Sequence, residues 1–191
     1  MTRVFIIAAS QVSEADVRAA HLGPKFGRLD LASQLAVLAV ESLRIQFDAW
    51  PRERIGLCLA VQAGSLTTDE QYWQGRNQVG GPSPALFTYT LPSSPLGEVA
   101  IRHRLTGPNL CLVGDDGIAL AEAADWLRQG TVDGCLCISC KAISPAAAKL
   151  LNTEPVATAR AIFLQRQEGG LRELLENDRD MESLLANIAQ P

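Results

Sequence analysis

The chain has 191 residues, of which 47% are hydrophobic and 20% are charged. This size and composition fit one globular unit with a packed core and exclude a long disordered tract. The formal net charge is −4, and the lysines and arginines form no basic stripe, which argues against nucleic acid or an anionic membrane as a partner.

The N-terminal apolar run, residues 4–9, is too short for a signal-peptide core or a membrane span, so we expect a cytoplasmic protein without a membrane segment. Cysteine use agrees with a reducing compartment. The five cysteines, at positions 58, 111, 135, 137 and 140, lie mostly in apolar runs and indicate buried free thiols. Because Cys135 and Cys137 would share one face of a buried strand, with no histidine nearby, we expect neither a metal nor a cofactor.

The first half of the chain alternates predicted strands and helices. Apolar runs at 3–9 and 55–63 are typical of buried strands. Between them, Asp30 is a suitable N-cap for a largely buried helix that extends to Phe47 and is ended by Pro51. The loop-rich stretch that follows, 64–84, contains Tyr72 and Trp73 within a short predicted helix.

The second half continues the alternation. Asp115 and Asp116 open a predicted helix that reaches Gln129 and is ended by Gly130. Strands are predicted at 110–113, 132–139 and 156–167, a helix at 98–105, and a short helix or a turn region at 142–151. Residues 170–189 are amphipathic and fit one helix or two short ones. The whole pattern predicts an α/β fold with layered helices on a mostly parallel mixed sheet.

Five segments between residues 3 and 166 resemble, in order, the N-terminal lobe of β-ketoacyl synthases, which have the thiolase-like fold. They read RVFIIAAS, RLDLASQLAVLAVESL, RIGLCLAVQAGSLTTD, SPALFTYTLPSSPLGEVAIRHRLTGP and ALAEAADWLRQGTVDGCLCIS. The fourth is the most specific, because the family has a proline, an apolar run, a dimer-contacting turn, a helix and Leu-x-Gly-Pro at the same separation. The resemblance implies a thiolase-like N-terminal half over residues 1–168, followed by a C-terminal amphipathic helical extension at 169–191.

The chain departs from this family at the nucleophile. In active members a cysteine follows the Gly-Pro at the N-terminus of a buried helix, where the helix dipole favours the thiolate. Counting places that position within Val113, Gly114, Asp115 and Asp116, and no cysteine lies between 112 and 134. The family's catalytic histidines lie in a C-terminal lobe that this chain would not reach. The resemblance therefore implies a subunit without catalytic residues of its own.

Family members that lack the nucleophile are the chain-length factors, which pair with an active ketosynthase. The resemblance implies a heterodimer in which the partner supplies the catalytic residues and this chain shapes the acyl tunnel. Such pairs act in type II fatty acid, polyketide or aryl-polyene biosynthesis, and acyl carrier protein is a further candidate partner.

The segment Pro84–Gly97 corresponds to the family segment that crosses the dimer interface. Leu86 and Thr90 fall on the positions that reach the partner, and the flanking candidates are Phe87, Tyr89, Leu91 and Ser93. Each buried methylene contributes about 0.8 kcal/mol, so a bulky side chain at the tunnel floor can limit acyl length. The alternative is that these aromatic residues belong to an ordinary core.

Other interpretations remain beside the resemblance. Asp115 and Asp116 fit helix N-caps better than functional remnants, because Asp accepts hydrogen bonds from the free N–H groups of a helix. A stand-alone acyl-binding or acyl-transfer protein, or a hydrolase, would use Cys111 or Asp115 with His103, but the spacing offers no support. A nucleotide-binding fold would need a G-x-G-x-x-G loop after a strand, which the sequence lacks.

Overall fold

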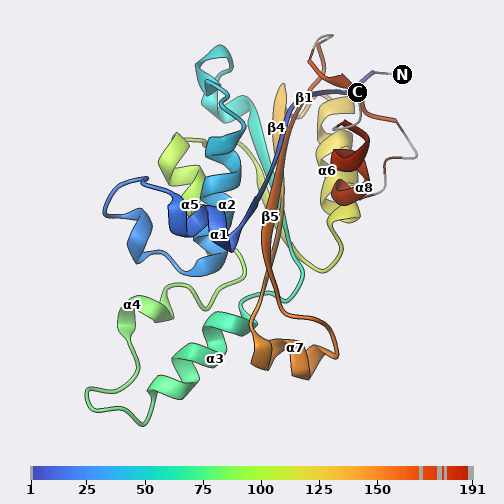
Figure 1. Ribbon diagram of the computed structural model, residues 1–191. Coiled ribbons are helices and arrows are strands. Elements are labelled where there is room, and N and C mark those ends of the chain that lie inside the picture. The colour runs from blue at the N-terminus through green and yellow to red at the C-terminus, as the bar shows by residue number, and fades with distance from the viewer. Residues whose placement is uncertain (1, 168–169, 176–177, 179, 189–191) are drawn as a thin grey trace.

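A six-stranded sheet forms the centre of the described part of the chain, with helices on both of its faces (Figure 1). The computed structural model describes residues 2–167, 170–175, 178 and 180–188. The sheet order is β3-β2-β4-β5-β1-β6. The strands are β1 (Phe5–Ser13), β2 (Ile55–Val61), β3 (Asn109–Val113), β4 (Gly134–Ile143), β5 (Val156–Gln165) and β6 (Arg172–Glu173).

The sheet is mixed, as expected. β2 pairs in parallel with β3 and β4, whereas β5 is antiparallel to both β4 and β1, and β6 is antiparallel to β1. It follows that β1 to β4 point in one direction and β5 and β6 in the other. Four of the six described strands therefore point the same way, but neighbouring strands pair in parallel only in the β3-β2-β4 part of the sheet.

The helices form two layers and one end group (Figure 1). One face of the sheet is covered by α1 (Glu14–Ala19), α2 (Leu31–Ser42) and α5 (Ser94–His103), and the other by α6 (Asp116–Arg128) and α8 (Met181–Ile188). At one end of the sheet lie α3 (Leu66–Gly75), α4 (Pro84–Phe87) and α7 (Pro145–Leu151). The predicted layered arrangement is therefore confirmed.

Alternation along the central strands builds a core on each face. In β2, Leu57 and Leu59 belong to the core under α2 and α5, whereas Cys58 belongs to the core under α6. Strands with two apolar faces are typical of sheets covered on both sides. The cysteines of the described residues are free, as predicted. Cys137 and Cys140, although spaced C-x-x-C, lie in opposite cores.

The first long helix is shorter than predicted. Asp30 caps it as expected, accepting a hydrogen bond from the Ser33 amide at 3.0 Å, but α2 ends at Ser42. Arg44 then adopts a left-handed conformation with φ 54°. The turn brings Phe47 onto the core, where it is 4% exposed and its ring centroid lies 5.7 Å from that of Phe163. Burial of Phe47, and not Pro51, therefore decides where the helix ends.

The connection into β3 requires a glycine at position 107. A Cβ atom there would lie 2.1 Å from the Ile55 carbonyl oxygen, which no side chain can tolerate. The close approach lets the Pro108 carbonyl accept a hydrogen bond from the Leu57 amide at 3.0 Å. Gly107 thus sets the position of β3 beside β2.

The C-terminal segment is not helical throughout, contrary to the prediction. Arg172 and Glu173 form β6 along the free edge of β1, and the Leu174 amide donates to the Val4 carbonyl at 2.8 Å. Among the described residues of this segment only those of α8 are helical, and its Met181 and Leu184 are 0% and 1% exposed. The described part of the segment therefore completes the core on the α6 face instead of standing apart from it.

Candidate functional site

The segment 84–97 crosses the surface at the end of the sheet where α3 and α4 lie. Phe87 and Leu91 are both 60% exposed, Ser93 is exposed, and Leu86, Tyr89 and Thr90 are half-buried. None of these side chains enters a buried core cluster of the described residues. The alternative that Phe87 is ordinary core is therefore wrong.

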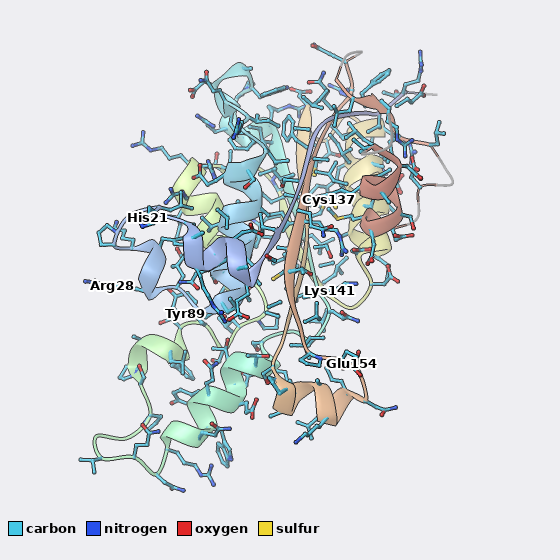
Figure 2. The ribbon with its side chains drawn as sticks, viewed as in Figure 1. His21, Arg28, Tyr89, Cys137, Lys141 and Glu154 are labelled. Carbon is cyan, nitrogen blue, oxygen red and sulfur yellow. The ribbon has the colours of Figure 1, made fainter. Side chains whose placement is uncertain are left out.

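Polar contacts hold this segment on the body of the molecule. Tyr89, which lies between the α1–α5 layer and α3 in Figure 2, donates its hydroxyl to Glu98 Oε1 at 3.2 Å. Burial, followed by the charge of Glu98, raises the pKa of the Tyr89 phenol. The Thr90 carbonyl accepts a hydrogen bond from Ser65 Oγ at 2.9 Å, and the Phe87 ring lies 5.4 Å from that of Tyr72. The backbone is thus fixed while the apolar side chains face outward.

The same region borders the open edge of the sheet. Among the described strands, β3 pairs only with β2, so its other edge has no strand partner. Pro92 and Val113 lie together, since both would meet a Cβ built on Gly64 at 3.5 to 3.8 Å. We give the name β3-edge surface to four exposed apolar residues: Phe87 and Leu91 of the segment 84–97, Val113 at the end of β3, and Ile118 of α6. Val113 and Ile118 are 63% and 60% exposed.

The position of the expected nucleophile is the N-terminus of α6, where the chain has two aspartates. Asp115 is exposed, and its Oδ1 accepts a hydrogen bond from the Gly117 amide at 2.6 Å, which confirms its role as an N-cap. Asp116 does not cap α6. It is buried, and its Oδ1 accepts a weak hydrogen bond of 3.4 Å from the Met181 amide at the start of α8. Asp115 therefore caps the N-terminus of α6, and Asp116 contacts the N-terminus of α8.

A cavity of about 450 Å³ lies in front of this helix end. Its lining contains the predicted Gly114, Asp115 and Asp116, and also Gln62, Ser139, Lys141, Asp180 and Glu182. Gln62 and Gly114 directly follow β2 and β3, so the cavity lies at the carboxyl ends of the parallel strands, where open α/β sheets commonly bind ligands. Figure 2 shows Lys141 toward the end of the sheet from which α7 leaves.

Charged groups on the sheet hold α8 over this cavity. Arg160 of β5 is 6% exposed, donates through Nε to Gln11 at 2.9 Å, and lies 3.0 Å from Glu182 Oε2. Lys141 approaches the same carboxylate at 3.8 Å. The Nη1 atom of Arg160 has no hydrogen-bond partner among the described residues. Acidic groups outnumber cations around the cavity, so it suits neither an anion nor a reactive thiolate.

The residues needed by the stand-alone enzyme alternative lie apart. Cys111 packs toward the α2 and α5 core, on the face of the sheet opposite α6, and its Sγ donates to the Pro92 carbonyl at 3.3 Å. Burial raises the pKa of the Cys111 thiol, which disfavours the nucleophilic thiolate. His103 ends α5 beside Phe47, near the start of β2, whereas Asp115 follows the far end of β3. The fold therefore does not bring His103 to Asp115.

Several cavity residues were missed from the sequence. Gln62, Ser139 and Lys141 could have been found by the general rule that sites gather at the carboxyl ends of parallel strands. Asp180 and Glu182 could not, because nothing in the amphipathic pattern of the C-terminal segment indicates where it docks.

The described residues contain no helix long and apolar enough to cross a membrane.

No protein-family model matches the sequence, and no curated protein matches it. Solved structures do. A chain of "the ishigamide ketosynthase/chain length factor" matches with a TM-score of 0.71 and 21% identity, over 89% of this chain and 64% of that one. A chain of AntDE:AntF, a type II polyketide acyl-carrier protein with its ketosynthase bound to the hexaketide, matches with a TM-score of 0.76 and 16% identity, over 92% and 67%.

A third match is the ketosynthase ApeO in complex with its chain length factor ApeC from Xenorhabdus doucetiae, with a TM-score of 0.66 and 17% identity over 88% of this chain and 81% of that one. The chain spans about two thirds of the length of the first two solved chains. These likenesses confirm the thiolase-like α/β fold expected from the sequence.

Proposed function

We propose that this chain is a non-catalytic, chain-length-factor-like subunit that pairs with an active β-ketoacyl synthase and shapes its acyl tunnel. Polyketide, fatty acid and aryl-polyene biosynthesis of the type II kind are the settings in which such a cytoplasmic pair would act, with acyl carrier protein as a further partner. The observation that carries the proposal is the β3-edge surface: four large apolar side chains are exposed, and one of them, Val113, ends a strand whose outer edge has no partner among the described strands.

Exposure of this kind is characteristic of an interaction site. An open strand edge has free N–H and C=O groups that readily pair with another chain, and exposed apolar patches mark protein interfaces. The polar contacts of Tyr89 and Thr90 hold Phe87 and Leu91 outward, so the exposure is built into the fold. A ketosynthase is the proposed occupant because two of the solved structures with this fold are described as ketosynthases with their chain length factors.

The N-terminus of α6 supports a non-catalytic role. The capping carboxylate of Asp115 and the buried carboxylate of Asp116 occupy the helix end at which a nucleophilic thiolate would be stabilised. Neither aspartate has a histidine within the contacts of the described residues. Chemistry would then depend on the partner, and this chain would contribute side chains such as Leu86 and Thr90 to the wall of the tunnel.

The test is co-expression of the full chain with each full-length ketosynthase of the source genome, followed by size-exclusion chromatography with light scattering. We expect a 1:1 complex with one of them. Phe87→Asp and Leu91→Asp should weaken that complex at least about tenfold, because a charge is then buried in an apolar interface. Leu150→Asp is the matched control, since Leu150 is 75% exposed but lies on α7 and is not part of the β3-edge surface.

Two results would refute the proposal. One is a stable monomer that becomes covalently acylated when incubated alone with an acyl carrier substrate, as seen by intact-protein mass spectrometry. The other is a ketosynthase complex that both interface variants leave unchanged.

In an intact pair, Leu86→Trp should shorten the longest acyl product by one or more units, because the larger side chain fills tunnel volume.

A further inference from the structure

A second surface feature lies at the opposite end of α5 from the β3-edge surface. It is a hollow of about 610 Å³ lined by Arg52, Arg102, His103 and Arg104, together with Asp48 and the turn 45–47. The chain as a whole is acidic, with a net charge of −4. A cluster of guanidinium groups on the surface of an acidic protein is a local positive charge, and such a charge can bind an anion.

The acidic groups nearby neutralise only part of this charge. Asp48 pairs with Arg52, and Glu41 pairs with Arg102. In the described part of the chain, the side chains of Arg104 and of Arg44, which precedes Ile45 of the lining, make no hydrogen bond or ion pair. One guanidinium charge of the lining, that of Arg104, therefore remains free, and Arg44 carries a second free charge next to the lining in the chain.

Both free arginines occupy backbone positions that normally favour glycine. Arg44 follows α2 with φ 54°, and Arg104 follows α5 with φ 55°, both left-handed. Non-glycine residues are uncommon there because the Cβ atom is crowded. The helix carbonyls are already capped by the backbone, since the Arg104 amide donates to Ile101 and the Leu105 amide to Ala100. Capping therefore does not explain why the side chain is arginine.

His103 provides a built-in reporter in the same hollow. Its ring packs edge-on against Phe47, with 5.1 Å between centroids, and its buried Nε2 has no hydrogen-bond partner among the described residues. The charged groups that face it are Glu41 on α2, at 3.8 Å, together with Arg102 and Arg52. An anion bound among these arginines would change the magnetic environment and the pKa of this imidazole.

We infer that the hollow binds the phosphate group of a small organic phosphate, with Arg104 as the free donor beside Arg52 and Arg102. Planar guanidinium groups match phosphate oxygens in a bidentate manner, which lysine does not. The volume exceeds that of phosphate alone, so part of an organic group also fits. The inference is independent of the proposed pairing with a ketosynthase, because the hollow and the β3-edge surface lie at opposite ends of α5.

The test is NMR of the full chain with labelled histidines. The sequence has two histidines, and His21 lies on the loop after α1, outside the hollow (Figure 2). Inorganic phosphate and phenyl phosphate, each at constant ionic strength, should shift the His103 ring signals in a saturable way and leave those of His21 unchanged. Arg104→Gly should weaken binding by about tenfold or more, as expected for a lost charge-assisted hydrogen bond.

Thermal stability separates this role from a structural one. Glycine adopts the left-handed conformation without strain, so Arg104→Gly should leave the melting temperature unchanged or raise it while phosphate binding is lost. Arg28→Ala, which removes an exposed arginine of the 26–28 turn, is the control and should bind as the parent does. A His103 shift that chloride reproduces, or that Arg104→Gly retains, would overturn the inference. Binding of inorganic phosphate without phenyl phosphate would overturn the assignment to an organic ester.

Discussion

Replacing Leu184 by alanine should destabilise the whole molecule, although the residue lies near the C-terminus. It belongs to α8, and its side chain is 1% exposed and packs into the core on the α6 face. The substitution removes buried carbon atoms worth about 0.8 kcal/mol each and leaves a cavity, so the free energy of unfolding should fall by about 3 kcal/mol. For a chain of this size that corresponds to a melting temperature lower by about 6 to 12 °C.

Leu150→Ala is the matched control, because Leu150 is also helical but is 75% exposed. It should change the free energy of unfolding by less than about 0.5 kcal/mol. Urea unfolding of both variants, followed by far-UV circular dichroism, measures the difference. The argument that α8 belongs to the common core fails if Leu184→Ala costs under 1 kcal/mol, or if α8 melts in a separate, earlier transition while the rest is unaffected.

Three further predictions concern single contacts. Hydrogen bonding from Arg54 lowers the pKa of Asp133, so this contribution to stability is complete above the ordinary Asp value of about 3.9 and is lost as pH falls through the lower folded-state pKa. Asp133→Asn should therefore reduce the dependence of the urea unfolding midpoint on pH between pH 5 and pH 3. An unchanged dependence would contradict this assignment. Gly107→Ala should prevent accumulation of folded protein, because its Cβ would meet the Ile55 carbonyl at 2.1 Å; a normal melting curve would be incompatible with the β2–β3 connection. Asp115→Ala should lower the free energy of unfolding by about 1 kcal/mol and Asp115→Asn by much less, since Asn also caps helices; equal losses in calorimetry would argue against the cap.

The parts of the fold that could be predicted from sequence are those governed by local physics. β2 and β4 are continuous apolar runs, and Asp30 and Asp115 are capping residues whose geometry depends only on the next three positions. The end of α2 could not be predicted, because it is set by the burial of Phe47 against the distant Phe163. The strand β6 was missed for the same reason: its pairing partner lies at the other end of the chain.

The candidate site shows the same division. The resemblance located the segment with Phe87 and Leu91 and the helix end at Asp115, and both lie next to the open edge of the sheet. Sequence alone could not decide whether Phe87 was core or surface, because periodicity is absent from a short loop rich in turns. The docking of Glu182 beside Arg160 depends on a tertiary contact between segments with no periodic relationship.

The sulfur atoms under α8 make local opening of this helix measurable without any added label. Cys137 Sγ lies 3.8 Å from the thioether of Met181, and burial raises the pKa of the Cys135 and Cys137 thiols well above the ordinary value. Such thiols react with a disulfide reagent only while the helix is detached, so the modification rate reports the equilibrium population of the detached form. Cys111 is half-buried on the edge strand β3 and packs on the opposite face of the sheet, so its modification rate does not depend on α8 and serves as an internal control.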